Sequence, residues 1–168
     1  MNAKNPIEDV VKPAVEGTMN VLSSLRKATS VKRYVHTSSI AAVMRMNEAN
    51  GNVFDESDFN TYSSVANGDA YGYAKYESEM RVWQFMREES IRARQLDFVV
   101  LNPAFVFGEC FTKAHTKASP VLLRHVIYGS KQVPFTTWAV DVDDVATAHV
   151  RALTMDSSTN KVSIGHFA

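Results

Sequence analysis

The chain has 168 residues, of which 45% are hydrophobic and 21% charged, so it is long enough for one domain with a substantial buried core. Its 18 basic residues balance 18 acidic ones, which argues against a nucleic-acid-binding surface and a polybasic membrane anchor. We therefore expect small molecules or proteins as partners. No apolar run approaches the ~20 residues that span a bilayer, residues 1–6 carry no signal-peptide pattern, and the lone Cys110 fits a reducing compartment. We expect a cytoplasmic protein, with an organelle as the alternative.

The first part of the chain alternates helical, strand-like and loop-like patterns. Apolar residues recur at three- and four-residue steps in residues 6–27, which predicts an amphipathic helix. Residues 32–37 form a short strand-like run that ends at the polar pair Ser38 and Ser39. Residues 45–69 are rich in Asn, Asp, Ser and Gly, which suits an irregular loop on a rigid scaffold.

The middle of the chain predicts a parallel sheet. Residues 71–93 have a helical pattern, and the compact hydrophobic run 96–101 is typical of a strand buried on both faces. A strand, a crossover helix and another strand make a βαβ unit, which implies a doubly wound α/β sheet. Ligands in such sheets lie beyond the carboxyl ends of the strands. Ser39 and Pro103 each follow a strand and Tyr71 starts the helix between them, so we expect all three at one edge.

The last part of the chain predicts two further helices, over residues 120–128 and 145–153. Asp143 is expected to be the N-cap of the second one, because a carboxylate there accepts free backbone N–H groups. The five histidines have neither an H-x-x-x-H spacing nor a cysteine partner, so no metal site is expected.

The spacing of Tyr71 and Lys75 is the strongest chemical signal in the chain. Positions four apart share one face of a helix, so the phenol and the ammonium can point into one site. A cation there favours the phenolate and brings proton exchange closer to neutral pH. With Ser39 to hold a substrate oxygen, these groups suit the reduction of a carbonyl or the oxidation of an alcohol beside a hydride carrier. The spacing alone also fits a solvated helix face with a half-buried tyrosine.

Five sequence blocks are spread over nearly the whole chain. They are HTSS at 36–39, DESDF at 55–59, YGYAK at 71–75, NPAFVFG at 102–108 and VDDVA at 142–146. In this order they resemble the extended short-chain dehydrogenases/reductases of the NAD-dependent epimerase/dehydratase superfamily, especially the branch of dihydroflavonol, cinnamoyl-CoA and fungal carbonyl (methylglyoxal) reductases. The resemblance implies a Rossmann-type doubly wound parallel sheet, with NADP(H) as cofactor and NAD(H) as the alternative.

The resemblance also implies roles for individual residues. Tyr71 would donate the proton to the carbonyl oxygen, and Lys75 would hold the nicotinamide ribose and favour the phenolate. Ser39 would hydrogen-bond the substrate oxygen. The remaining cofactor contacts would come from Pro103, Ala104, Phe105 and Val106, which would line the nicotinamide, and from Ser119, a candidate for a phosphate contact.

Some features of the family are missing from the sequence. The seven glycines do not form its G-x-x-G-x-x-G phosphate loop. Because the family's chains are usually much longer, we expect residues 1–168 to be the second half of an NAD(P)-binding domain without its first βαβ units. Residues 109–168 would include part of the substrate-binding region. We also expect a hydrophobic sheet edge, with Phe98, Val99 and Val100, that a missing chain segment or a protein partner covers.

Two functions remain open from the sequence. One is an NADP(H)-dependent carbonyl reductase, an enzyme that reduces an aldehyde or ketone to an alcohol. The other is a reductase-derived structural or accessory subunit without turnover. The retained Ser39, Tyr71 and Lys75 favour the enzyme, and the missing phosphate loop favours the accessory subunit. Met44 stands where flavonoid-type reductases carry a substrate-contacting asparagine, which argues against a flavonoid substrate.

Overall fold

The fold is built on a three-stranded parallel sheet. The computed structural model describes residues 3–45, 53–92, 96–129, 138–155 and 161–164. The strands lie in the order β1 (Arg33–Thr37), β2 (Asp97–Pro103) and β5 (Lys161–Ile164). A second parallel pair joins β3 (Phe105–Phe107) to β4 (Ala139–Asp141). The expected α/β fold with parallel strands and a crossover helix is confirmed.

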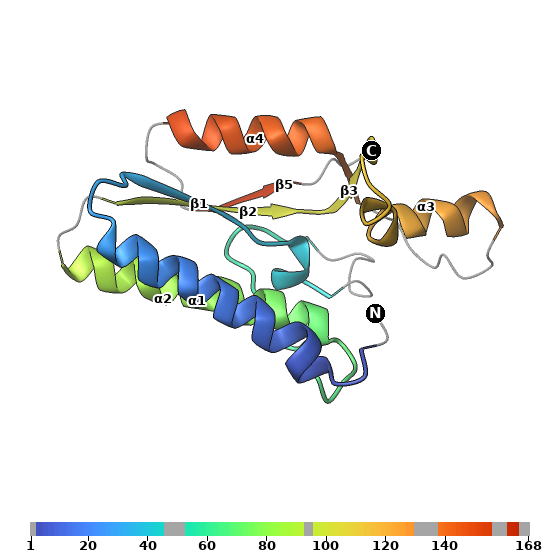
Figure 1. Ribbon diagram of the computed structural model, residues 1–168, viewed down its shortest axis with the longest axis horizontal. Helices are drawn as coiled ribbons and strands as arrows, with labels where there is room; N and C mark the ends of the chain where they lie inside the picture. Colours follow the sequence, from blue (N-terminus) through green and yellow to red (C-terminus); the bar gives the residue numbers. More distant parts are fainter. Residues whose placement is uncertain (1–2, 46–52, 93–95, 130–137, 156–160, 165–168) are drawn as a thin grey trace.

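Helices cover both faces of the larger sheet (Figure 1). A π-helical turn (Ile7–Val11) leads into α1 (Lys12–Lys27), which lies beside α2 (Ala70–Ile91) on one face. The opposite face carries α4 (Val142–Thr154), and α3 (Pro120–Ile127) extends from the end of the molecule near β3. Short 3-10 turns occupy Ile40–Ala42 (η2) and His115–Lys117 (η4). Among the helices that the structure describes, none combines the length and the apolar character needed to cross a membrane.

The side chains of β2 form the centre of the core. Phe98 and Val100 pack toward α1 and α2 in a cluster with Leu22 and Phe85, among others. The alternate residue Leu101 joins a second cluster on the face covered by α4. Because successive side chains of a strand point to opposite faces, a strand with a helix layer on each side must be apolar throughout. This explains the continuous hydrophobic run and confirms the prediction of a strand buried on both faces.

Most expected elements are present, but the expected cap of the last helix is wrong. The helix α4 begins at Val142, and its N-cap is Asp141, whose Oδ1 accepts a hydrogen bond from the Asp143 N–H at 2.8 Å. Asp143 lies inside the first turn, where its carboxylate faces the positive end of the helix dipole without capping it. The reason is that β4 leads directly into α4, so the helix begins earlier than the sequence pattern predicts.

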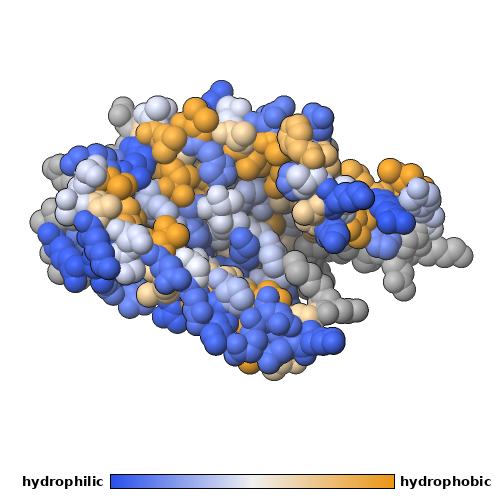
Figure 2. Space-filling model, in the orientation of Figure 1, coloured by the Kyte–Doolittle hydropathy of each residue, from blue (hydrophilic) through white to orange (hydrophobic). Residues whose placement is uncertain are grey.

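The expected hydrophobic edge is also wrong. Phe98, Val99 and Val100 are 5%, 9% and 0% exposed, because β2 is the central strand of the sheet rather than an edge strand. In the described part of the chain, the large exposed hydrophobic side chains include Ile127 on α3, which is 75% exposed, and Val150 on α4, which is 64% exposed. Figure 2 shows hydrophobic surface over both of these helices.

The cap assignment predicts different costs for two neighbouring aspartates. Asp141→Ala removes the side chain that satisfies a free N–H of α4, so we expect the free energy of unfolding to fall by about 1 kcal/mol. Asp143→Ala is the matched control: it removes a carboxylate from the same helix end but keeps the cap, and should cost less. Urea denaturation of the purified variants measures both values. An equal or larger loss for Asp143→Ala would contradict the assignment.

Candidate active site

Three segments meet at the carboxyl edge of the sheet. The register pairs Thr37 with Leu101, so β1 and β2 end side by side, and the Ser38 N–H donates to the Leu101 carbonyl at 2.8 Å. Ser39 follows β1, and Tyr71 is the second residue of α2. In a parallel sheet the carboxyl ends of neighbouring strands share one edge, which is where ligands bind in open α/β folds.

The start of α2 is held by a side-chain cap. Asp69 Oδ1 accepts from the Gly72 N–H at 2.9 Å, and Asp69 Oδ2 accepts from the Ser63 hydroxyl at 2.6 Å. A Cβ at Gly72 would collide with the Asp69 carboxylate, so a residue without a side chain is needed there. Because Tyr71 precedes this glycine, the cap sets the position of its phenol.

A cavity of about 460 Å³ lies at this edge. Its polar lining residues are Ser39, Asp69, Tyr71 and Ser119. The rest is mainly apolar and comes from Ile40, Ala41, Met44, Ala104, Phe105 and Ala118. Five of the predicted site residues are therefore brought together: Ser39, Tyr71, Ala104, Phe105 and Ser119. Pro103 is buried at the end of β2, Val106 lies in β3 and Lys75 lies one turn along α2 from Tyr71; none of the three is among the described residues that line this cavity.

Ser39 has a structural bond as well as a place on the cavity. Its Oγ accepts from the Ala41 N–H at 3.2 Å and caps the short turn η2. A hydroxyl that accepts one bond still carries a proton that it can donate. Ser39 can therefore serve as a hydrogen-bond donor toward the cavity while its position is held by η2.

Lys75 lies one turn beyond Tyr71 on the same helix. Its Nζ is 5.9 Å from the centre of the Tyr71 ring and donates to the Ser38 carbonyl at 3.4 Å. Burial lowers the pKa of the Lys75 ammonium, and the negative charge of Glu79 raises that pKa part of the way back. Tyr71 is 44% exposed, so the pair places a solvent-accessible phenol above a largely buried amine.

Glu79, which the sequence analysis did not single out, is a buried acid below this pair. Glu79 is 0% exposed and accepts hydrogen bonds from Ser38 Oγ at 2.6 Å, Asn102 Nδ2 at 2.7 Å and Trp83 Nε1 at 3.0 Å. A glutamate four residues after a lysine normally suggests a surface ion pair. The available signal was its spacing, because Tyr71, Lys75 and Glu79 follow one another at four-residue steps and so share one face of α2.

His36, on β1, lies under the same site. Burial and the nearby positive charge of Lys75 lower the pKa of His36 to about 4, although the charge of Glu79 opposes the shift. Its Nδ1 is hydrogen-bonded to the Tyr34 hydroxyl at 3.0 Å. The imidazole is therefore neutral at physiological pH. In the described part of the chain, no group of three or more metal-ligating side chains comes together.

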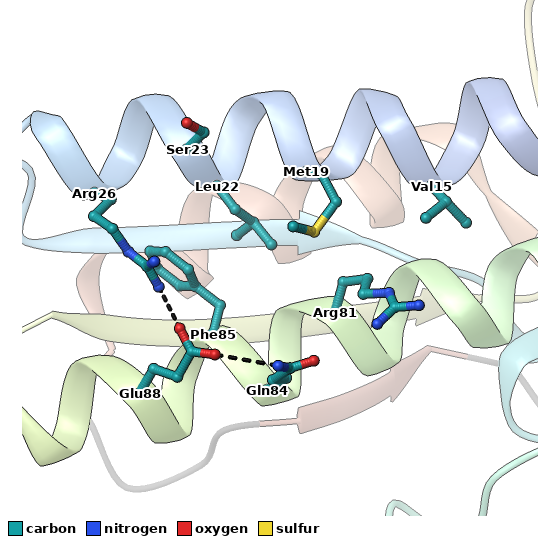
Figure 3. Close-up of a pocket in the computed structure, with 9 residues that line it drawn as sticks. All are labelled: Val15, Met19, Leu22, Ser23, Arg26, Arg81, Gln84, Phe85 and Glu88. Atoms are coloured by element: carbon teal, nitrogen blue, oxygen red, sulfur yellow. Dashed lines mark hydrogen bonds and ion pairs between the residues drawn. The ribbon is translucent and has the colours of Figure 1, made fainter.

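A second pocket, of about 510 Å³, lies between α1 and α2 (Figure 3). Its polar groups bond one another: Arg26 Nη2 contacts Glu88 Oε2 at 2.5 Å, and Gln84 donates to Glu88 Oε1 at 3.2 Å. Phe85, which also lines it, lies roughly 20 Å along α2 from Tyr71 at 1.5 Å per residue. This pocket is therefore separate from the candidate active site.

Comparison with protein families finds one that covers almost the whole chain. The profile of the NAD dependent epimerase/dehydratase family matches residues 2–165. A cinnamoyl-CoA reductase of Medicago truncatula is 34% identical over 95% of this chain and 48% of its own length. A dihydroflavonol 4-reductase of Arabidopsis thaliana is 29% identical over 88% of this chain and 39% of its own length. The chain thus spans about half the length of the curated relatives it matches.

Solved structures agree with the sequence comparison. The yeast methylglyoxal/isovaleraldehyde reductase complexed with NADPH superimposes with a TM-score of 0.83 at 27% identity. That match covers 98% of this chain and 53% of the yeast protein. The resemblance inferred from the five sequence blocks is confirmed, including the branch of reductases to which they pointed.

The lowered pKa of His36 predicts a loss of stability in acid. The unfolded chain takes up a proton on this histidine near pH ~6.5, whereas the folded protein does so only at about pH 4. The unfolded state therefore binds more protons between these pH values, and stability falls as the pH decreases through this window. We expect the free energy of unfolding of the wild type to fall by on the order of 2 kcal/mol through His36 by pH 4.5. His36→Gln should abolish this loss.

Denaturation curves at several pH values measure this difference between the wild type and His36→Gln. The same substitution at His125, an exposed residue of α3, controls for the removal of an imidazole. Parallel pH dependences of the wild type and His36→Gln would show that His36 is not kept neutral by the fold.

Proposed function

The chain belongs to the NAD dependent epimerase/dehydratase family, and from this premise we propose that it carries the catalytic residues of an NADP(H)-dependent reductase of aldehydes or ketones. The observation that supports this most is the position of Tyr71. Tyr71 lines the cavity, Lys75 lies partly buried one turn along the same helix, and Ser39 lines the same cavity.

The chemistry of the cavity favours a neutral carbonyl substrate. Ile40, Met44 and Phe105 form apolar walls, and the one charged residue among the described lining residues is the acidic Asp69. A sugar nucleotide would bring phosphate groups toward a site with no cation in that lining. The relatives are named as reductases of cinnamoyl-CoA, dihydroflavonol and methylglyoxal or isovaleraldehyde, which also supports a reductase.

The residues present fit the nicotinamide end of the cofactor. Phe105 and Ala104 offer an apolar wall for a ring. Lys75 lies outside the cavity lining, one turn along α2 from Tyr71, and we assign its amine to the ribose hydroxyl groups. The structure of the yeast relative is an NADPH complex, which supports NADPH as the cofactor. The sequence holds no G-x-x-G-x-x-G loop, so we assign the pyrophosphate contacts to residues outside this chain. Ala118 and Ser119 support the assignment of residues 109–168 to the substrate-binding region.

When bound, NADPH supplies a hydride for the carbonyl carbon. The residues of this chain provide the proton and the orientation. Ser39 donates a hydrogen bond to the carbonyl oxygen, and Tyr71 transfers its phenolic proton to that oxygen as the negative charge develops. The charge of Lys75 stabilises the phenolate that remains. One hydride and one proton together convert the carbonyl to an alcohol, and Tyr71 then regains its proton from solvent through its exposed side.

Tyr71→Phe tests the proton donor. Only the hydroxyl is lost, so in a protein that includes the pyrophosphate-binding residues we expect carbonyl reduction to fall ~10²–10⁴-fold while NADPH binding stays nearly intact. NADPH consumption with isovaleraldehyde as a probe substrate measures the rate, and calorimetric titration measures binding. Tyr128→Phe, at a 79% exposed position on the surface, is the matched control and should retain full activity.

A rate for Tyr71→Phe within about threefold of the wild type would remove this residue from the mechanism. Absence of reductase activity in a wild-type protein that includes the pyrophosphate-binding residues, with NADPH and a panel of aldehydes and ketones, would favour the accessory-subunit function instead.

Lys75→Met should affect two properties at once, because we assign its ammonium both to the nicotinamide ribose and to the phenolate of Tyr71. The dissociation constant for NADPH should rise and the maximal rate should fall. Titration and steady-state kinetics on the same preparation separate the effects. If only one of the two constants changes, the double role is wrong.

A further inference from the structure

The buried carboxylate of Glu79 has no role in the reaction as described above. Tyr71, Lys75 and Glu79 lie at successive turns of one face of α2, and the exposed fraction of the residue falls from 44% at Tyr71 to 0% at Glu79. A carboxylate in the protein interior is costly unless hydrogen bonds and charges compensate it. Its partners therefore reveal what the group holds in place.

Those partners are residues of the active-site edge. Ser38 Oγ at 2.6 Å and Asn102 Nδ2 at 2.7 Å both donate to Oε2 of Glu79. Ser38 directly follows β1, and Asn102 is the last residue but one of β2. Trp83 Nε1 donates to Oε1 at 3.0 Å from the next turn of α2. One carboxylate thus ties the helix that carries Tyr71 to the ends of both strands.

The same partners lead on to the proposed catalytic groups. Asn102 Nδ2 also donates to the backbone carbonyl of Ser39 at 3.1 Å. Lys75 Nζ donates to the backbone carbonyl of Ser38 at 3.4 Å. Asn102 therefore links the Glu79 carboxylate to the backbone of Ser39. Ser38 links the same carboxylate, through its hydroxyl and its carbonyl, to Lys75.

We propose that Glu79 is a positioning residue of the reductase site, which rests on the function proposed above: its carboxylate holds Ser39 through Asn102 and places a negative charge beneath Lys75. Glu79 itself touches neither the substrate nor the cofactor. Its charge keeps the Lys75 ammonium protonated despite burial, and its hydrogen bonds set the distance between the Ser39 and Tyr71 hydroxyl groups.

The charged and titratable groups around this carboxylate define what a pH profile can report. Lys75 on α2 and His36 on β1 feel its charge, whereas Ser38, Asn102 and Trp83 are neutral. His36, whose pKa is about 4, stays neutral above that pH with or without Glu79, because removal of the carboxylate lowers its pKa further. A change in the alkaline range therefore reports on Lys75, whose pKa the charge of Glu79 raises.

Glu79→Gln is the first test, made in the protein that shows reductase activity. It keeps the shape of the side chain and removes the charge, and its NH₂ group must face at least one donor that the carboxylate accepted. We expect the maximal rate to fall ~10-fold or more. We also expect the alkaline limb of the rate profile to move to lower pH by about one unit, because loss of the negative charge of Glu79 favours the neutral amine of Lys75.

Glu79→Asp separates the effect of the negative charge from the effect of the hydrogen bonds. It keeps the negative charge near Lys75 but withdraws it by one methylene from Ser38 and Asn102. The maximal rate should fall at least threefold, and the alkaline limb should remain near that of the wild type. Thermal melting of both variants confirms that the protein is folded, and Glu79→Asp still decides the positioning role if Glu79→Gln does not fold.

Three results would overturn the proposal. A folded Glu79→Gln with a reduced rate but an unmoved alkaline limb would make Glu79 purely structural. A folded Glu79→Asp with the rate of the wild type would show that the hydrogen bonds position nothing. Wild-type kinetics in both variants would remove Glu79 altogether. Tyr71→Phe in the same assay keeps the two proposals distinct: if it is inactive while the Glu79 variants behave as wild type, only the Glu79 proposal fails.

Discussion

The arrangement of the site depends on a carboxylate that must be satisfied inside the protein. Glu79 is 0% exposed, and leaving it without partners would cost several kcal/mol. Ser38 and Asn102 satisfy it from the ends of the two strands, which fixes how far α2 can slide or rotate against the sheet. Tyr71, two turns nearer the start of the helix, is thereby held at the carboxyl edge.

Apolar packing supplies most of the stabilisation that supports this arrangement. Burial of side chains such as Phe98 and Val100 is worth about 1.5–3 kcal/mol each relative to exposure. An exposed ion pair such as Lys12 with Glu8 contributes far less, because solvent screens its charges. Helix layers on both faces therefore keep β2 in the centre of the sheet, and the polar groups of Glu79 and Asn102 select the register within that packed core.

The chain carries the residues of the candidate active-site cavity, although it matches only about half the length of its relatives. The match to the yeast reductase covers 98% of this chain but 53% of that protein. The segments that form the cavity run from Ser39 to Ser119 and lie wholly within the shared part. The contacts that we propose to the nicotinamide end thus lie within this chain, and those that we propose to the pyrophosphate lie outside it.

The sequence by itself determined the helices, the strands of the βαβ unit and the pairing of Tyr71 with Lys75, because periodicity and four-residue spacing are local properties of the chain. The edge that collects Ser39, Tyr71 and Pro103 also followed from it, since parallel strands end on one side. Only the tertiary structure decided that Asp141 caps α4, that Phe98 to Val100 lie on a central strand, and that Glu79 is buried. Each of these depends on which distant segments pack together: strand order is set by long-range pairing, and a glutamate becomes internal only when Ser38 and Asn102, far from it in sequence, arrive to bind it.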